Sequence, residues 1–381
     1  MGQSYPSPAI PSKRTGAFYA AYFGVLGVVL PFLGPFLSER GLGAVAVGLA
    51  TAAFSLAKLV YTPFLGRQVD RGWWFPGILS SHMVLAVLAS LLLLGSRDPL
   101  VLGVALLVVG VGYGTVLPLV EAAVLERPPE RGYGFVRWWG SAGFVAVSGV
   151  AAAVLGGGHL DAFPILLTAV LVVLGIACLT LETEARPERA PGKGTWVSGA
   201  PVWLLLAILT LNQVAHGPYY AFFSIHLREH GLGTGLVAGL WSAAVLAEAV
   251  AFVAGGRLER RFGLGRLLGL ALALAPIRWL LLSLPPSLPL LVVAQLCHAA
   301  TFAAAHLAGV QLVQRAVPPG ARRNAQALYS GLAFGLGIVV GTAAAGPLYA
   351  AVSGSGAFLT AAGLSVLVAA GWFALARRLP G

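Results

Sequence analysis

The feature that most constrains this chain is a series of apolar runs that approach or reach the length needed to cross a lipid bilayer. Residues 163–181 read FPILLTAVLVVLGIACLTL and residues 82–95 read HMVLAVLASLLLLG, without a charged side chain. A helix spans the hydrocarbon core of a bilayer with about 20 apolar residues. Backbone polar groups in lipid must be hydrogen-bonded internally, and the period-2 alternation of a membrane β-barrel is absent. The runs therefore predict an all-α membrane protein.

The composition supports a membrane class for the whole chain. Of 381 residues, 58% are hydrophobic and 10% are charged, whereas about a quarter of the residues in a soluble domain are charged. The first apolar run contains Pro31 and Pro35 and no small-residue cleavage site, so we do not expect a cleaved signal peptide. We predict twelve transmembrane helices, at residues 17–37, 44–65, 74–95, 99–124, 137–156, 162–181, 201–226, 236–255, 267–284, 289–314, 325–350 and 356–376.

The placement of Lys and Arg predicts the orientation of the chain in the membrane. With the N-terminus inside, the outer loops hold only Arg40, Arg97 and Arg228, and nearly all other basic residues fall on inner segments. Cytoplasmic loops carry such an excess. We therefore expect both termini to be cytoplasmic, in a bacterial inner or plasma membrane. Topology also explains the net charge of +11, so nucleic-acid binding is not needed to account for it.

A short loop motif occurs twice, about half the chain apart. GRQVDRGW follows the second predicted span and GGRLERRFG follows the eighth. A single copy would also fit a generic inner turn with positive charge, but two copies at matching places indicate two related halves. The glycine permits close helix contact, and the acid and the arginines can pair across the interface. The matched residues are Gly66, Asp70 and Arg71 in the first copy and Gly255, Glu259 and Arg260 in the second.

This pattern resembles the major facilitator superfamily over essentially the whole chain. The resemblance implies two pseudo-symmetric six-helix bundles, residues 1–181 and 201–381, joined by a cytoplasmic linker at residues 182–200. It also implies alternating access, in which the bundles rock around a central site. By the same resemblance we expect a monomer embedded in the lipid bilayer.

Five charged side chains lie within or at the ends of predicted spans. A charge that faces lipid is costly, so these residues are expected to line the interior and to be functional. Arg137 begins a face that continues at i+4 and i+7 with Ser141 and Phe144. Trp241 and Glu248 share another face at i and i+7. The five charged residues are Lys58, Glu121, Arg137, Glu248 and Arg278.

A third face combines Asn212, His216 and Tyr219 at i, i+4 and i+7. A polar head with an aromatic body suits a small organic substrate. Aromatic residues at this spacing also fit lipid contact or packing within the bundle, and both interpretations stay open.

The stretch VEAAVLERPPERGYGFVRWWGSAGF (residues 120–144) resembles the region between the fourth and fifth helices of lactose permease and its relatives. A Glu and an Arg bind substrate together there, and the matching residues are Glu121 and Arg137. Phe144 matches an aromatic position that stacks on the sugar and that is Trp in lactose permease. An inner-gate salt bridge between Glu121 and Arg137 is the structural alternative.

In the second half, Glu248, Arg278 and His298 match charged or His positions of the same family's proton-coupling cluster. The acid that follows the His by three residues in that family is Thr301 here. Because Thr301 cannot titrate, we expect Glu248 to be the main proton carrier, with His298 as a relay and Glu121 as a second candidate. A purely structural ion pair between Glu248 and Arg278 is the alternative.

The bacterial phenylpropionate permease family is more similar still. YGFVRWWGSAGFV, AHGPYYAFFSI, LWSAAVLAEAVAF and CHAATFAAAHLA resemble its signatures, including the Thr at position 301, and its second helix carries a basic residue where Lys58 stands. This resemblance implies import of a small organic acid together with protons. Lys58, Arg137 or Arg278 would bind the carboxylate.

Other functions of the same fold stay open at this stage. A neutral sugar or nucleoside would use Glu121 and Arg137 to bind hydroxyl groups, and a drug exporter fits less well because the acids here are balanced by bases. For a neutral cargo, Lys58 would not matter for affinity. A scaffold without transport would not need paired charges in both halves.

The sequence contains no pattern that predicts an enzyme or a metalloprotein. It has no HExxH, no phosphate loop and no nucleophile elbow, and GLGTG (residues 231–235) is a weak nucleotide signal. Cys178 and Cys297 are single residues in separate spans, so neither a disulfide nor a metal site is expected. His298 and His306 lie eight positions apart, which is poor ligand spacing. We expect no cofactor, and only substrate, protons and lipid as partners.

Overall fold

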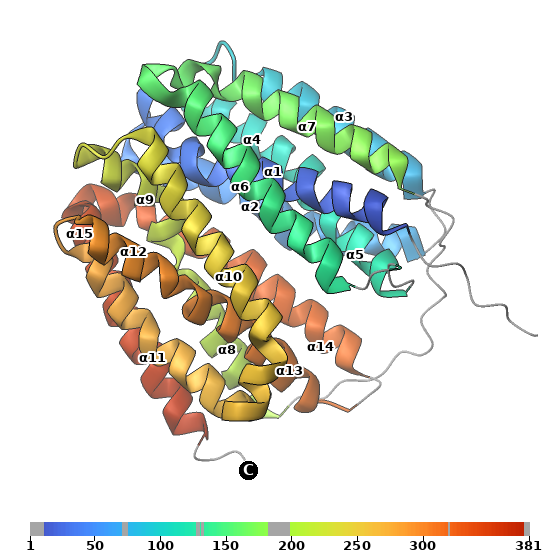
Figure 1. The fold of residues 1–381 in the computed structure, drawn as a ribbon, viewed down its shortest axis with the longest axis vertical. Coiled ribbons are helices and arrows are strands. Elements are labelled where there is room, and N and C mark those ends of the chain that lie inside the picture. Colours follow the sequence, from blue (N-terminus) through green and yellow to red (C-terminus); the bar gives the residue numbers. More distant parts are fainter. Residues whose placement is uncertain are drawn as a thin grey trace, which may run out of the picture.

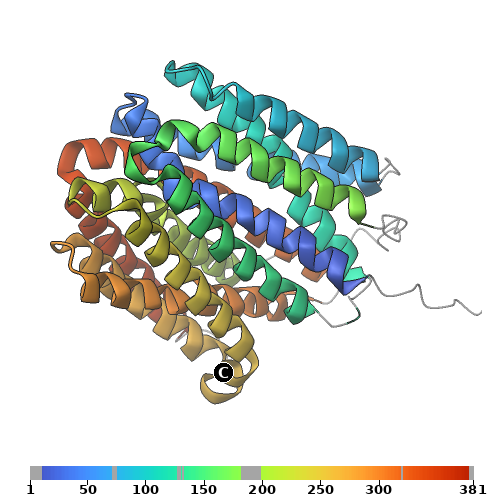
Figure 2. The ribbon, with the colours of Figure 1, turned by 45° about the horizontal axis from the view of Figure 1, so that its top comes forward.

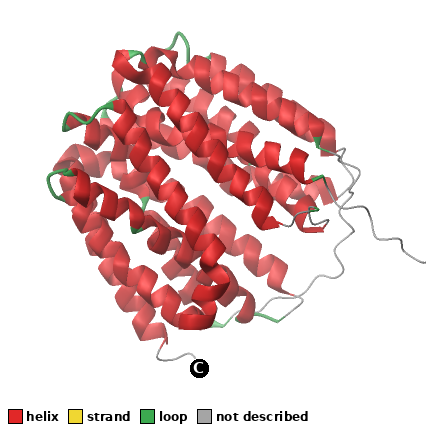
Figure 3. Ribbon diagram, in the orientation of Figure 1, coloured by secondary structure: helices red, strands yellow, loops and turns green. Residues whose placement is uncertain are grey.

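The computed structural model describes residues 11–70, 75–126, 130, 133–181, 199–318 and 321–376. All regular structure in these ranges is helical, as Figure 3 shows, with short loops between the helices. The helices follow from the sequence, because a buried or lipid-facing backbone can satisfy its polar groups internally only in this way. The predicted all-α class is thus confirmed for the described residues.

The described residues of the first half form seven α-helices. Asp98 begins the fourth of them, since its Oδ1 accepts hydrogen bonds from the backbone N–H groups of Leu100 at 2.8 Å and Val101 at 3.0 Å. Two short 3₁₀ turns, Gly156–Gly158 and Leu160–Ala162, join the last two helices. The helices are α1 (Ser12–Glu39), α2 (Ala44–Asp70), α3 (Phe75–Leu91), α4 (Pro99–Gly114), α5 (Val116–Glu126), α6 (Tyr133–Leu155) and α7 (Phe163–Thr180).

In the second half, the part of the chain that the structure describes forms eight α-helices and two π-helical segments. A π-helix widens the turn and is rare outside functional regions. The π segments are η3 (Ala299–Ala304) and η5 (Ser330–Gly337), and each continues directly into an α-helix. The α-helices are α8 (Ala200–Ala215), α9 (Gly217–Glu229), α10 (Thr234–Phe262), α11 (Leu264–Ser283), α12 (Leu288–Leu296), α13 (Ala305–Arg315), α14 (Arg322–Tyr329) and α15 (Ile338–Ala376).

Ten helices of the described residues are long and apolar enough to cross a membrane. The third predicted span corresponds to α3, which has 17 residues and belongs to the shorter apolar helices. The last two predicted spans lie within one 53-residue segment, Asn324–Ala376. Ser353, with φ 63°, interrupts that segment between them. The count of twelve and the cytoplasmic termini stay predictions.

Helices of each half lie beside one another, as the blue-to-green and yellow-to-red ribbons show in two views (Figure 1 and Figure 2). In the first half α1 packs on α6, α2 on α4 and α3 on α7; in the second half α11 packs on α15. The halves meet where α2 contacts α15, α6 contacts α10 and α1 contacts α9. These contacts bring residues from distant parts of the sequence to one central region.

The contact between α1 and α6 depends on glycine. A Cβ atom at Gly143 would lie 2.1 Å from the backbone oxygen of Ala20, so no larger residue fits without moving a helix. Membrane helices associate through such close approach of backbones at small residues. Gly149, on the same helix, has no atom within 4 Å of a Cβ.

We predict that Gly143→Leu lowers the free energy of unfolding by about 3 kcal/mol, because overpacking forces α1 away from α6. Gly149→Leu is the matched control on α6 and should leave stability near the parent's. Thermal or denaturant unfolding of the purified variants measures both. Equal stability of the two leucine variants would contradict the packing described above.

Candidate functional site

Two adjoining cavities lie where the halves meet, and they share Phe23, Arg137, Ser141 and Glu248. The first, of about 250 Å³, is called the aromatic cavity. The second, of about 410 Å³, is called the charged cavity. Ring side chains that line the aromatic cavity are Phe23, Phe54, Phe144, Tyr220, Trp241, Phe302 and Phe334. Charged or titratable side chains that line the charged cavity are Glu121, Arg137, Glu248 and His306.

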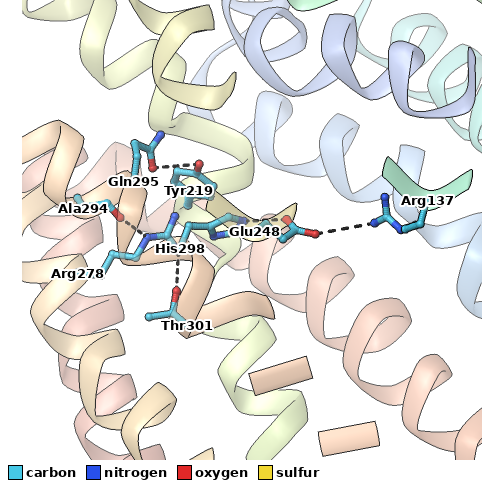
Figure 4. Close-up of polar contacts among 8 residues, drawn as sticks. All are labelled: Arg137, Tyr219, Glu248, Arg278, Ala294, Gln295, His298 and Thr301. Carbon is cyan, nitrogen blue, oxygen red and sulfur yellow. Dashed lines mark hydrogen bonds and ion pairs between the residues drawn. The ribbon is translucent and has the colours of Figure 1, made fainter. Parts of the chain in front are cut away.

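The Glu248 carboxylate lies between two positively chargeable groups (Figure 4). Its Oε1 is 3.9 Å from Nη2 of Arg137, and its Oε2 is 3.6 Å from Nε2 of His298. Arg137 comes from α6 in the first half, whereas Glu248 and His298 come from the second. Both distances exceed those of ordinary hydrogen bonds. The carboxylate is thus attracted by both neighbours but is not locked to either.

Arg137 is held by an aromatic ring as well as by charge. Its guanidinium carbon lies 4.1 Å above the centroid of Phe23 on α1, a cation–π contact. The side chain of Arg137 is 25% exposed, compared with 13% for Glu248, so its donors can be reached from the cavities. Ser141 and Phe144 follow on the same face of α6 and also line the aromatic cavity.

Arg278 forms a second, drier polar cluster behind the aromatic cavity. It is fully buried, with its guanidinium carbon 4.3 Å from the ring centroids of Tyr219 and Trp279. Nε donates to the backbone oxygen of Ala294 at 3.1 Å, and Nη1 donates to Oγ1 of Thr301 at 3.2 Å. An ion pair between Glu248 and Arg278, the structural alternative, is not found among the described residues, because aromatic rings and uncharged oxygens surround this guanidinium instead.

The family model of the MFS_1 like family matches residues 14–360. The chain belongs to the MFS_1 like family.

Two curated relatives are similar over most of their length. The Escherichia coli (strain K12) protein named "Probable 3-phenylpropionic acid transporter" is 29% identical, with 87% of this chain and 89% of the relative covered. The "Maltose permease" of Geobacillus stearothermophilus is 30% identical, with 84% of this chain and 83% of the relative covered. Members of this superfamily are transporters and not enzymes, so this chain is a multi-pass membrane transporter of small molecules.

Solved structures show the same fold at low identity. The nucleoside transporter NupG superposes with a TM-score of 0.82 at 15% identity, covering 96% of this chain and 99% of that chain. A bacterial homolog of the human lysosomal transporter Spinster, in an inward-facing and unoccupied conformation, superposes with a TM-score of 0.77 at 16% identity, covering 96% of both. The predicted superfamily resemblance is therefore confirmed.

Within this MFS transporter, three residues predicted to bind substrate do not line either cavity. Asn212 is buried and its Nδ2 donates to the backbone oxygen of Thr301 at 3.4 Å. Nδ1 of His216 is engaged by the backbone oxygen of Asn212, and the Tyr219 hydroxyl donates to Oε1 of Gln295. The physical reason is that this face packs against α11, where the ring centroids of His216 and Tyr219 lie 4.8 and 6.0 Å from that of Trp279. Tyr220, the next residue, lies on the cavity wall instead.

Several other predicted site residues do line a cavity. Arg137, Phe144, Trp241 and Glu248 line the aromatic cavity, and Nε1 of Trp241 donates to Oγ of Ser224 at 3.0 Å. Glu121 lines only the charged cavity.

The remaining two candidates concern α1 and α2. The Tyr19 hydroxyl donates to Oε1 of Glu121 at 3.4 Å, which places that carboxylate beside α1. Lys58 belongs to α2, and its side chain lies outside the described residues.

The second copy of the repeated loop is visible at the end of α10. A Cβ at Gly255 would lie 2.5 Å from Leu307, so the glycine permits close approach to α13. Glu259 accepts hydrogen bonds from Gln311 at 2.9 Å and Arg315 at 2.7 Å, both on α13. Its described partners are thus on α13 and do not include the neighbouring Arg260. In the first copy Gly66 and Asp70 belong to α2, and Arg71 lies outside the described residues.

The sequence analysis missed the rings that complete the aromatic cavity. Phe23 comes from α1, which carries no internal charge to draw attention to it. Phe302 and Phe334 lie in the two π segments, which apolar periodicity does not reveal. The glycines around Phe334 in SGLAFGLG are the one signal of unusual helix geometry there. Within the described residues no group of three or more potential metal ligands is close enough to bind an ion.

We predict that Thr301→Val lowers the free energy of unfolding by about 1–3 kcal/mol, because it leaves a buried donor of Arg278 without its acceptor. Thr301→Ser keeps the hydroxyl and should cost much less. The unfolding midpoints of both purified variants measure this difference in stability. If valine and serine are equally tolerated, the hydroxyl does not stabilise the guanidinium.

Proposed function

We propose that this transporter is a proton-coupled symporter that imports an aromatic carboxylate by alternating access between two six-helix halves. The halves are residues 1–181 and 201–381, with the linker at 182–200 and both termini on the cytoplasmic side. The observation that carries the proposal is a ring-lined cavity with Arg137 on its wall.

The aromatic cavity matches both parts of such a substrate. Phenyl-sized rings stack favourably against aromatic side chains, and Phe144, Trp241 and Tyr220 supply them from α6, α10 and α9. Arg137 presents a fork of donors that binds a carboxylate in bidentate fashion. Its loose contact with Glu248, at 3.9 Å, leaves these donors free to turn to a new partner.

Competition for Arg137 provides a physical reason for proton coupling. A carboxylate gains proton affinity when it is removed from water or when a neighbouring cation is taken away. A substrate carboxylate that binds Arg137 takes this cation from Glu248, so Glu248 then binds a proton. His298, 3.6 Å away, is the neighbouring group with which this proton is shared. When the substrate leaves, Arg137 returns and the proton is released.

Contacts between the halves support a conformation that is closed at the predicted outer end. Nη2 of Arg228 on α9 donates to Oε1 of Glu39 on α1 at 2.9 Å. Nearby, a Cβ at Gly34 would lie 2.8 Å from the backbone oxygen of Ala221, so α1 and α9 touch there. In alternating access these contacts would separate when the transporter opens outward.

The relatives agree with an organic substrate. The Escherichia coli relative carries the name of a 3-phenylpropionic acid transporter. The maltose permease and the nucleoside transporter with the same fold leave a neutral cargo as the second candidate.

We predict that Glu248→Gln abolishes uphill uptake of 3-phenylpropionate but preserves exchange of labelled for unlabelled substrate, because exchange needs no proton release. Proteoliposomes with and without an inward proton gradient measure both activities. Asp161→Asn is the control, because this exposed carboxylate pairs with Arg40 of the same half and lines neither cavity, so uphill uptake should be kept. Uphill uptake by Glu248→Gln at the parental rate would exclude Glu248 as the carrier.

One observation favours the neutral cargo. The charged cavity contains two carboxylates, Glu121 and Glu248. Carboxylates accept hydrogen bonds from hydroxyl groups, and they repel an anionic substrate.

Matched ligands separate the two candidates. A ligand raises the melting temperature of the purified protein by binding its native state, with about 2.7 kcal/mol of stabilisation at 100 times its Kd. We predict a rise with 3-phenylpropionate and none with 3-phenylpropionamide, which keeps the ring but lacks the charge. In Arg137→Gln the effect of the acid should disappear. A rise with maltose or uridine and none with the acid would favour the neutral cargo.

A further inference from the structure

We propose that His306 is the group through which the proton on Glu248 leaves toward the inner face of the membrane. The inference rests on the proposed proton coupling and adds a residue and a direction to it. His306 is the fourth ionisable side chain of the charged cavity, together with Glu121, Arg137 and Glu248.

The π segment places His306 on the cavity wall. In a regular α-helix, eight positions rotate a side chain by roughly 80° beyond two full turns, so His298 and His306 would face different directions. The wider turns of η3, between them, offset this rotation. The rings show the result: His298 stacks on Phe302 with centroids 5.0 Å apart, and Phe302 stacks on His306 at 6.5 Å. Both histidines therefore face the chamber from one column of rings.

The column runs from the Glu248 contact toward the predicted inner face. His298 is at the end of the column nearest to Glu248, with its Nε2 3.6 Å from Oε2 of Glu248. His306 lies further along α13, which ends at Arg315 on a segment predicted to be cytoplasmic. The charged cavity connects the two regions, since both Glu248 and His306 line it. Its volume of about 410 Å³ is enough for several water molecules that can carry a proton between them.

The partner of His306 suits a group that gains and loses a proton. Nδ1 lies 3.2 Å from the hydroxyl of Tyr329, which is buried. With the ring hydrogen on Nδ1, neutral His306 donates to the Tyr329 hydroxyl and leaves Nε2 open to a proton, and the imidazolium keeps the same donation. Both states of His306 thus keep this hydrogen bond. For Nε2 no hydrogen bond occurs among the described residues, so water in the charged cavity can reach it.

The charges that face His306 come from three helices. Glu248 on α10 and Glu121 on α5 favour a proton on the ring, and Arg137 on α6 opposes it. In the proposed step the Glu248 carboxyl gives its proton through water to Nε2 of His306. The imidazolium then releases a proton to the inner solution, and the Glu248 carboxylate attracts Arg137 again. No electrons move, and every group returns to its starting form.

The chain offers a matched control in another intramembrane histidine. Nε2 of His82 on α3 lies 3.2 Å from the hydroxyl of Tyr61 on α2, so it forms the same type of pair. His82 is not among the residues that line either cavity. Substitution of His82 therefore removes an equivalent side chain without touching the proposed route.

The test compares His306→Gln with His82→Gln in proteoliposomes that contain a pH-sensitive dye, with 3-phenylpropionate as the probe. We expect His306→Gln to slow net substrate uptake and the accompanying proton entry by about tenfold or more, as loss of a positioned proton-transfer group does. Exchange of labelled substrate should continue at the parental rate, which also shows that the variant is folded. His82→Gln should match the parent in both assays.

A rescue experiment covers the case in which the glutamine variant does not fold. His306→Ala should regain net uptake when imidazole is supplied on the side of the inner face, because the base can enter the charged cavity. Pyrazole has the same shape but is a far weaker base, and it should not restore uptake.

The outcomes separate this inference from the proposed function. Parental net uptake by His306→Gln, an equal loss of exchange and net uptake, or equal rescue by both azoles would overturn the role of His306 while leaving coupling through Glu248 intact. If 3-phenylpropionate drives no proton entry in the parent protein, the proposed function and this inference both fail.

Discussion

The attraction between Glu248 and Arg137, with the His298 ring beside them, is the interaction on which the rest of the site depends. Charges that are removed from water interact over long distances, because little solvent screens them. Arg137 belongs to the first half and Glu248 and His298 to the second, so one carboxylate joins the two halves across the chamber. Neither contact is short enough to be a fixed hydrogen bond, and a ligand or a proton can therefore replace it at small cost.

The surroundings keep this central contact adjustable. Phe23 contacts the Arg137 guanidinium through its ring face, and a cation–π contact tolerates rotation of the guanidinium. Arg278, in contrast, is fully buried and enclosed by Tyr219, Trp279 and backbone oxygen. The two arginines thus differ in position: Arg137 faces the cavities, and Arg278 is packed in the wall behind them.

Much of the fold could be predicted from the sequence, and the site could be predicted in part. The faces that begin at Arg137 and at Trp241 lie on the aromatic cavity, because α6 and α10 are regular helices that keep i, i+4 and i+7 on one side. The face at Asn212 does not, because it packs against Trp279 of α11 and the backbone at Thr301. Phe302 and Phe334 could not be assigned, since their positions depend on π segments that no local pattern predicts.

By itself the sequence determined the membrane class and the helical structure, because lipid forces a long apolar run to satisfy its own backbone. It also determined which charges must avoid lipid. Only the tertiary structure decided how these charges pair. Glu248 contacts Arg137 and His298, and not Arg278, because pairing depends on how α6 of the first half meets α10 of the second. The helix–helix contacts that set this geometry join residues far apart in the chain. The spacing of residues within a short stretch of sequence does not predict such contacts.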